Sequence, residues 1–98
     1  MLVYENSCFS DIIINLPYLE KYNIVDIIHN IHNKVVYKVS DKITNILYII
    51  KVKYISDITI LNKEVKIYNL LINNNHPNVE PIIETTVYKN KYLFIKSS

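Results

Sequence analysis

The sequence predicts an α+β fold, a five-stranded antiparallel sheet with one main helix. Two patterns carry this prediction. Runs rich in Ile, Val and Tyr favour strands, and one stretch in which apolar residues recur every three or four positions favours a helix. Their order along the chain is three strands, the helix and two strands. At 98 residues there is room for one domain.

The strand-like runs are bounded by residues that favour turns. They span residues 22–28, 35–39, 46–52, 82–88 and 92–95. Polar residues at 40–45 predict a hairpin between the second and third runs, and Lys-Asn-Lys at 89–91 predicts a turn between the last two. Aromatic residues suit the half-buried surface of a sheet, so we expect most of the nine tyrosines to pack there.

The helical stretch, residues 62–71, places a carboxylate on its inward side. The predicted inward face comprises Ile60, Leu61, Glu64, Ile67, Tyr68 and Leu71. Because an unpaired charge at a mostly apolar surface is costly, Glu64 needs a cationic partner, and Lys51 on the third strand is the natural one. Their separation of 13 residues (64 − 51) predicts a compact connection through Ser56 and Asp57 and a helix without its first turn.

Three features around these residues match one known family. They are Y-I-I-K at residues 48–51, Glu64 in the helix and H-P-N-V at residues 76–79. With the order of strands and helix, they resemble the N-terminal lobe of a protein kinase of the Ser/Thr type. The resemblance covers residues 21–98 and ends at the hinge between the two lobes of the family. Residues 1–20 are then an N-terminal extension.

The resemblance implies a site for ATP with Mg²⁺. In the family, the Lys of a V-A-I-K motif on the third strand contacts the α and β phosphates, and a Glu of the next helix holds that Lys in place. Lys51 and Glu64 match these two positions. Ile28 and Val36 match the apolar shelf above adenine, and Ile95 matches the gatekeeper.

Two departures from the family predict weak or absent ATP binding. Ile49 replaces a small Ala in the roof of the adenine pocket, and overfilling a packed site costs about 1–3 kcal/mol, or roughly a factor of ten to a hundred in affinity. The chain has no glycine, and His29, Ile31 and Lys34 occupy the glycine positions of the phosphate-binding loop. Because that loop visits positive φ close to the phosphates, we expect a β-branched Ile31 to be strained there.

The resemblance also limits the expected function. The family's large lobe supplies an H-R-D-type catalytic loop and a D-F-G Asp that binds Mg²⁺; the sequence contains neither, so this chain alone is not expected to transfer phosphate. The first hypothesis is a kinase small lobe whose large lobe lies elsewhere. The alternative is a stand-alone pseudokinase lobe that binds and regulates a partner kinase, and a third is a decaying remnant. The expected partner is a kinase large lobe or a partner kinase.

Composition argues against other classes of protein. Hydrophobic residues make up 50% of the chain, without the run of about 18 apolar residues that a membrane span requires, so no membrane is expected. The net charge is +2 and all 11 basic residues are Lys, so nucleic acid is not an expected partner. Abundant Ile, Asn, Lys and Tyr indicate AT-rich codons, as in a large cytoplasmic DNA virus or an AT-rich parasite.

The remaining polar residues and the N-terminus lead to further expectations. The single Cys8 excludes an internal disulfide, and the N-terminus does not resemble a secretory signal, so we expect the cytoplasm as the default location, or the host cytoplasm for a virus. His29 and His32 lack the convergent ligands of a zinc site, so no metal site is expected. The apolar segment at residues 11–17 should either pack back onto the sheet or helix or offer a strand or short helix to a partner.

Overall fold

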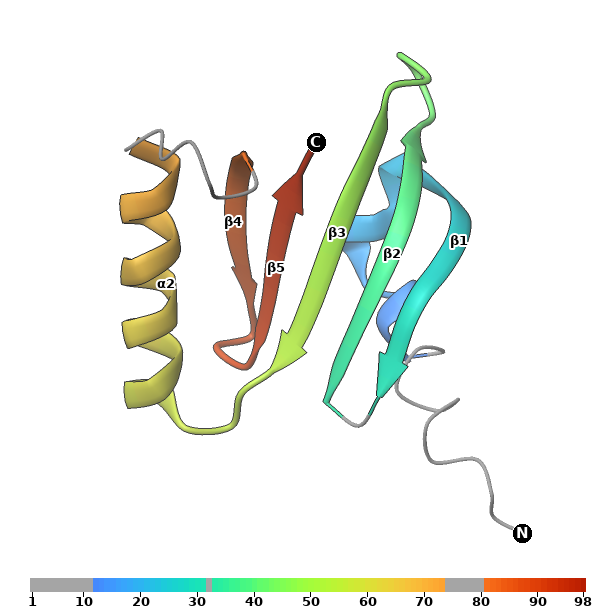
Figure 1. Cartoon of the computed structure of the whole chain (residues 1–98). Coiled ribbons are helices and arrows are strands. Elements are labelled where there is room, and N and C mark those ends of the chain that lie inside the picture. The colour runs from blue at the N-terminus through green and yellow to red at the C-terminus, as the bar shows by residue number, and fades with distance from the viewer. Residues whose placement is uncertain (1–11, 32, 74–80) are drawn as a thin grey trace, which may run out of the picture.

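The computed structural model describes residues 12–31, 33–73 and 81–98 and has the predicted α+β architecture (Figure 1). Its five strands form one antiparallel sheet in the order β1-β2-β3-β5-β4, which confirms the predicted fold class. The elements are η1 (Pro17–Lys21), β1 (Tyr22–Ile31), β2 (Lys34–Asp41), β3 (Leu47–Tyr54), α2 (Ile58–Asn73), β4 (Ile82–Tyr88) and β5 (Tyr92–Ser97). Helix α2 follows β3 in the chain and lies beside β4 (Figure 1).

Only β4 has the predicted bounds, and the other four strands are longer.

Because β1 continues to Ile31 and β2 begins at Lys34, the loop expected between them is a tight β-hairpin. Asn33 takes the left-handed backbone conformation of this turn, with φ of 70°. The backbone N–H of Tyr54 donates to the carbonyl oxygen of Asn33 at 3.0 Å, which ties the end of β3 to the hairpin.

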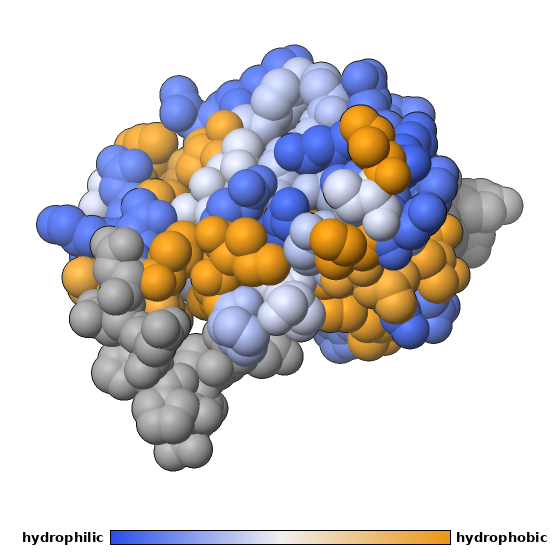
Figure 2. All heavy atoms as spheres, turned by 90° about the horizontal axis from the view of Figure 1, so that it is seen from above, coloured by the Kyte–Doolittle hydropathy of each residue, from blue (hydrophilic) through white to orange (hydrophobic). Residues whose placement is uncertain are grey.

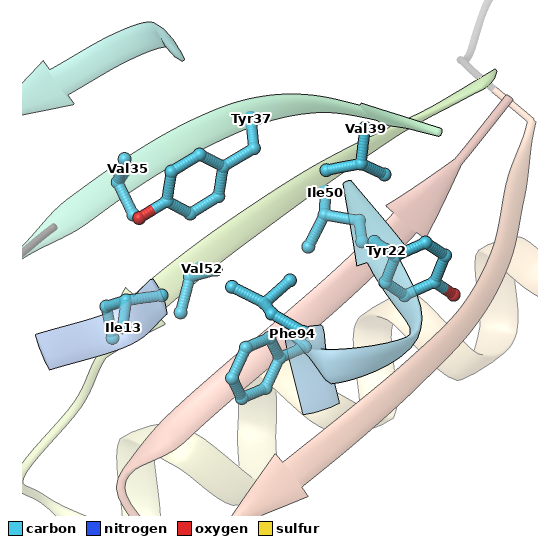
Figure 3. Packing of buried hydrophobic residues seen from close by; sticks show 9 residues of the cluster. Ile13, Tyr22, Val35, Tyr37, Val39, Ile50, Val52 and Phe94 are labelled. Carbon is cyan, nitrogen blue, oxygen red and sulfur yellow. The ribbon is translucent and has the colours of Figure 1, made fainter. Parts of the chain in front are cut away.

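Side chains of β2 and β3 alternate between the two faces of the sheet. The face that we call the core face carries Val35, Tyr37, Val39, Ile50 and Val52, all buried. These residues form one cluster with Ile13, Leu19, Tyr22 and Phe94 (Figure 3). The opposite face, which we call the helix face because a residue on it contacts α2, carries Lys34, Val36, Lys38, Ile49, Lys51 and Lys53.

The segment before β1 closes the core face. Ile13 is fully buried, and Leu19 in η1 is 3% exposed. The Tyr18 ring lies 4.5 Å from the ring of Phe94 between centroids, and its hydroxyl donates to Glu84 Oε2 at 2.8 Å. Burial and this hydrogen bond raise the pKa of Tyr18 well above its usual value. The expectation that this segment packs back onto the sheet is therefore confirmed.

Helix α2 begins directly after an N-cap. Asp57 Oδ1 accepts hydrogen bonds from the backbone N–H groups of Thr59 at 2.8 Å and Ile60 at 3.3 Å, which satisfies donors that have no partner inside the helix. The connection at residues 55–57 is compact, as predicted. The helix starts four positions before the predicted stretch, because Asp57 supplies the cap that allows an early first turn.

The inward face of α2 is rotated from the predicted one. Leu61 is 1% exposed and packs with Leu93 and Ile95 of β5, with Val65 and Tyr68 beside it. The predicted inward residues Ile60 and Ile67 are instead 50% and 56% exposed. Sequence spacing identified an apolar helix, but contact with β4 and β5 buries only one side of its wide apolar surface.

The buried N-terminal segment can be tested with two adjacent isoleucines. Ile13→Ala should lower the free energy of unfolding by about 2–5 kcal/mol, because it removes buried methyl groups and leaves a cavity. Ile12→Ala is the matched control, since Ile12 is 52% exposed, and should change stability little. Urea unfolding followed by circular dichroism measures both. Equal losses in the two variants would contradict the packing described.

Candidate functional site

Four predicted site residues lie together on the helix face. Val36 lies directly opposite Lys51, and Lys51 directly opposite Ile95, so these three form one row across β2, β3 and β5. Ile49 is the next residue of β3 on the same face, opposite Ser97. Long-range strand pairing therefore brings together residues that are up to 59 positions apart in the chain (95 − 36).

This row combines an apolar floor with a cation. Val36 is 8% and Ile95 is 2% exposed, while Lys51 is half-buried. A hollow of about 230 Å³ next to the row is lined by Lys38, Leu47, Tyr48, Ile49 and Ser98. It is smaller than the roughly 300–1,000 Å³ of typical small-molecule pockets. Ile49 is one of the residues that line this hollow.

Ile28, the other predicted shelf residue, does not join the row. The pairing of β1 with β2 shifts register between Ile27 and His29, so Ile28 lies at a β-bulge and His29 is the residue opposite Val36. The Ile28 side chain is 54% exposed. Regular alternation along β1 would place Ile28 in the row only if the strand had no bulge. The sequence carries no clear signal for the bulge at Ile28.

Glu64, the sixth predicted residue, forms an ion pair with Lys53. Lys53 Nζ lies 2.9 Å from Glu64 Oε1, with the two side chains 26% and 28% exposed. Tyr68 supports the same ammonium group, with its hydroxyl at 3.5 Å and its ring centroid at 5.7 Å. Lys51, the predicted partner of Glu64, lies two residues earlier on the same face of β3. The contact that Glu64 makes in the structure is with Lys53, whereas the sequence predicted Lys51 as its partner.

The short connection between β3 and α2 explains this choice of partner. With Asp57 capping the helix three residues after β3 ends at Tyr54 (57 − 54), the early turns of α2 lie beside the end of β3, where Lys53 lies. Partial burial tends to lower the pKa of Lys53, but the hydrogen bond to Glu64 and the contact with Tyr68 outweigh it and raise that pKa. Lys53 is therefore a firmly charged, positioned cation. Lys51 and Lys53 are two residues apart in β3 and therefore share one face of the strand. This spacing was the sequence signal that could have identified Lys53 as a partner of Glu64.

The β1–β2 hairpin differs from a glycine-rich loop. His29 and Ile31 lie in β1 and Lys34 begins β2, so none of the three residues at the expected glycine positions takes positive φ. The strain predicted for Ile31 is absent, because Asn33 supplies the left-handed residue that the turn requires. The hairpin therefore closes without glycine, and it closes tightly.

Other candidate sites find no support in the part of the chain that the structure describes. Within residues 12–31, 33–73 and 81–98, no group of three or more His, Cys, Asp or Glu side chains could hold a metal ion. No helix in these ranges has the length and apolar character to cross a membrane. Cys8, His32 and the H-P-N-V motif at residues 76–79 lie outside the described residues. No family model and no curated protein matches the chain.

The assignment of Glu64 to Lys53 can be measured with a double-mutant cycle. Lys53→Met and Glu64→Gln should show a coupling energy of about 0.5–1 kcal/mol in urea unfolding, because the pair is direct and partly shielded from water. The same cycle with Lys51→Met in place of Lys53→Met is the matched control and should give a smaller coupling. A larger coupling for Lys51 would show that the predicted pair, rather than the observed one, dominates in solution.

The β1–β2 turn gives a second test. Asn33→Ala should lower the free energy of unfolding by about 1 kcal/mol, because alanine in the left-handed conformation brings Cβ close to the carbonyl oxygen. Asn33→Gly should be neutral or slightly stabilising, since glycine adopts positive φ without this clash. Thermal unfolding compares the two variants. Equal losses would mean that the Asn33 side chain, and not its backbone conformation, is what the turn needs.

Proposed function

We propose that this chain is the small lobe of a protein kinase of the Ser/Thr type and binds ATP on its helix face. The single observation that carries the proposal is the row formed by Val36, Lys51 and Ile95, flanked by Ile49 and by the ion pair of Lys53 with Glu64. An apolar floor suits the base, and lysines beside it suit the phosphates. The strand order and the position of α2 are compatible with this assignment.

The residues of this face fit a nucleotide better than a free magnesium ion. Lysines dominate the surface, and the carboxylate of Glu64 is engaged by Lys53. Mg²⁺ would therefore arrive with the phosphates of ATP rather than bind to a protein site here. The sequence holds no H-R-D-type or D-F-G-type motif, so the proposed role is to bind and orient the nucleotide while a kinase large lobe supplies the chemistry. The predicted cytoplasmic location belongs to the same proposal.

The alternative proposal, a pseudokinase lobe that binds a partner kinase, draws on a different surface. Large apolar side chains are exposed in the β2–β3 hairpin, at the start of β3, late in α2 and early in β4; they are Ile43, Ile46, Leu47, Leu70 and Ile83. These segments lie at the upper end of the molecule in Figure 1. Figure 2 looks onto this end and shows hydrophobic side chains gathered in patches among hydrophilic ones. Such patches favour a protein contact. The closed β1–β2 hairpin, which lacks a glycine-lined anion site, also favours this alternative.

Thermal unfolding with Mg·ATP distinguishes the two proposals. The midpoint should rise with ATP concentration, because a ligand that binds only the folded state stabilises it. Lys51→Ala should remove most of this rise, whereas Lys42→Ala, which changes an exposed lysine of the β2–β3 hairpin, should preserve it. Ile49→Ala should increase the rise relative to its own ligand-free midpoint, because it widens the space beside the apolar row.

Two results would contradict nucleotide binding. No rise with Mg·ATP up to millimolar concentration, in either the unmodified chain or Ile49→Ala, would leave the binding-only lobe as the surviving proposal. A rise that Lys51→Ala and Lys42→Ala preserve equally would place the nucleotide elsewhere on the molecule.

A further inference from the structure

Strand β1 is an edge of the sheet, and no strand among the described residues pairs with its outer side. It is the longest of the five strands and runs from Tyr22 to Ile31. Four of its large apolar side chains are 43% to 54% exposed; they are Val25, Ile27, Ile28 and Ile31. A long edge strand with exposed apolar side chains can pair with a strand of another chain.

The other edge strand, β4, is less open. Helix α2 lies beside it (Figure 1), and Thr85 Oγ1 of β4 donates to Asn69 Oδ1 of the helix at 2.9 Å. Strand β4 is also shorter than β1. Of the two edges of the sheet, β1 is therefore the one that can accept a further strand.

A bulge brings a carboxylate and an imidazole of β1 to the same face of the sheet. Asp26 lies opposite Lys38, and His29 lies opposite Val36. Both of these β2 residues are on the helix face, so Asp26 and His29 share that face, and both are exposed. In a regular strand, residues three apart would face opposite sides. The register shift at Ile28 therefore decides this arrangement.

The resulting pattern is complementary to itself in an antiparallel pair of β1 strands. Ile27 lies between the two polar residues and faces the core side, opposite Tyr37. When Ile27 of one copy lies opposite Ile27 of a second copy, Asp26 of each copy lies opposite His29 of the other. Symmetry forms this pair twice. An imidazole donates a hydrogen bond to a carboxylate or attracts it as a cation, and such cross-strand pairs stabilise a sheet.

The backbone at the centre of this register has a local partner that a second strand can replace. The N–H group of Ile27 donates to Asp26 Oδ1 at 2.9 Å in an exposed hydrogen bond. Bulges and side-chain contacts of this kind limit indiscriminate pairing of edge strands. A strand in the matching register replaces the bond with one to its own carbonyl oxygen and releases the Asp26 carboxylate toward His29 of the other copy.

We infer that two copies of this chain form a symmetric dimer by pairing their β1 strands edge to edge, with Asp26 of each copy opposite His29 of the other. The two sheets then form one continuous sheet across the two-fold axis. The inference does not depend on the proposed nucleotide binding, since it concerns the outer edge of β1 and requires no ligand.

Sedimentation velocity over a range of protein concentrations tests the dimer by charge exchange. Asp26→Lys and His29→Asp each place like charges opposite one another, so each variant alone should dimerise about tenfold more weakly or less. An equal mixture of the two should restore dimers, because the new lysine of one copy faces the new aspartate of the other. Asp26 also lies opposite Lys38, and restoration in the mixture cannot come from a weakened fold.

The centre of the interface is tested with two exposed isoleucines. Ile27→Lys should prevent dimerisation, because it places two ammonium groups next to each other at the two-fold axis. The matched control Ile43→Lys makes the same change in the β2–β3 hairpin, where Ile43 is 90% exposed, and should keep the dimer. Thermal unfolding followed by circular dichroism establishes that both variants are folded.

Three results would overturn the inference. The first is an unmodified chain that stays monomeric up to millimolar concentration, which would leave the edge to a strand of another protein. The second is a dimer that Ile27→Lys and Ile43→Lys preserve equally, which would place the interface elsewhere. The third is a mixture of Asp26→Lys and His29→Asp that dimerises no better than either variant alone.

Discussion

The pairing of β2 with β3 is the constraint on which the rest of this molecule depends. Val35, Tyr37 and Val39 must be buried, so the residues between them face the other side of the sheet. A slip of one residue would exchange the two sets and drive lysines into the core. The candidate site is therefore a consequence of how the core is built, because the same alternation that buries one face delivers the lysines to the other.

Different segments cover the two faces of the sheet. The N-terminal segment closes the core face, where Ile13 and Leu19 complete the main cluster (Figure 3). On the other face, α2 packs against β4 and β5 through Leu61 and reaches β3 through the ion pair of Glu64. Because α2 covers only the side of this face formed by β4 and β5, the row of Val36 and Lys51 lies beside the helix rather than beneath it (Figure 1). A face covered on one side only is the kind of surface that can receive a ligand while still resting on a rigid scaffold.

The ion pair of Lys53 with Glu64 contributes more to geometry than to stability. Pairs that remain about a quarter exposed contribute little net free energy, because water screens the attraction and the free side chains lose conformational freedom on pairing. The pair nevertheless connects α2 to β3 at one defined point, and Tyr68 limits the motion of the ammonium group. Any shift of the helix along the sheet would therefore change the position of the Lys53 side chain directly.

Periodicity was sufficient to predict the five strands, the helix and the inward position of Glu64, because alternation and helical spacing are local properties of a sequence. The family resemblance, and not periodicity, grouped Val36, Ile49, Lys51 and Ile95, and strand pairing places these four residues on one face of the sheet. Periodicity could not predict the bulge at Ile28 or the turn at Asn33, where a single residue changes the register or closes the hairpin. Periodicity also did not identify which side of α2 faces the sheet.

The sequence by itself determined the α+β class and the order of the elements along the chain, because both follow from patterns of apolar side chains. Only the tertiary structure decided which lysine meets Glu64 and which lysines become neighbours. The first depends on where the cap at Asp57 starts the helix and how Leu61 seats it on the sheet. The second depends on the register between strands, and both are relations between distant residues that no local pattern contains.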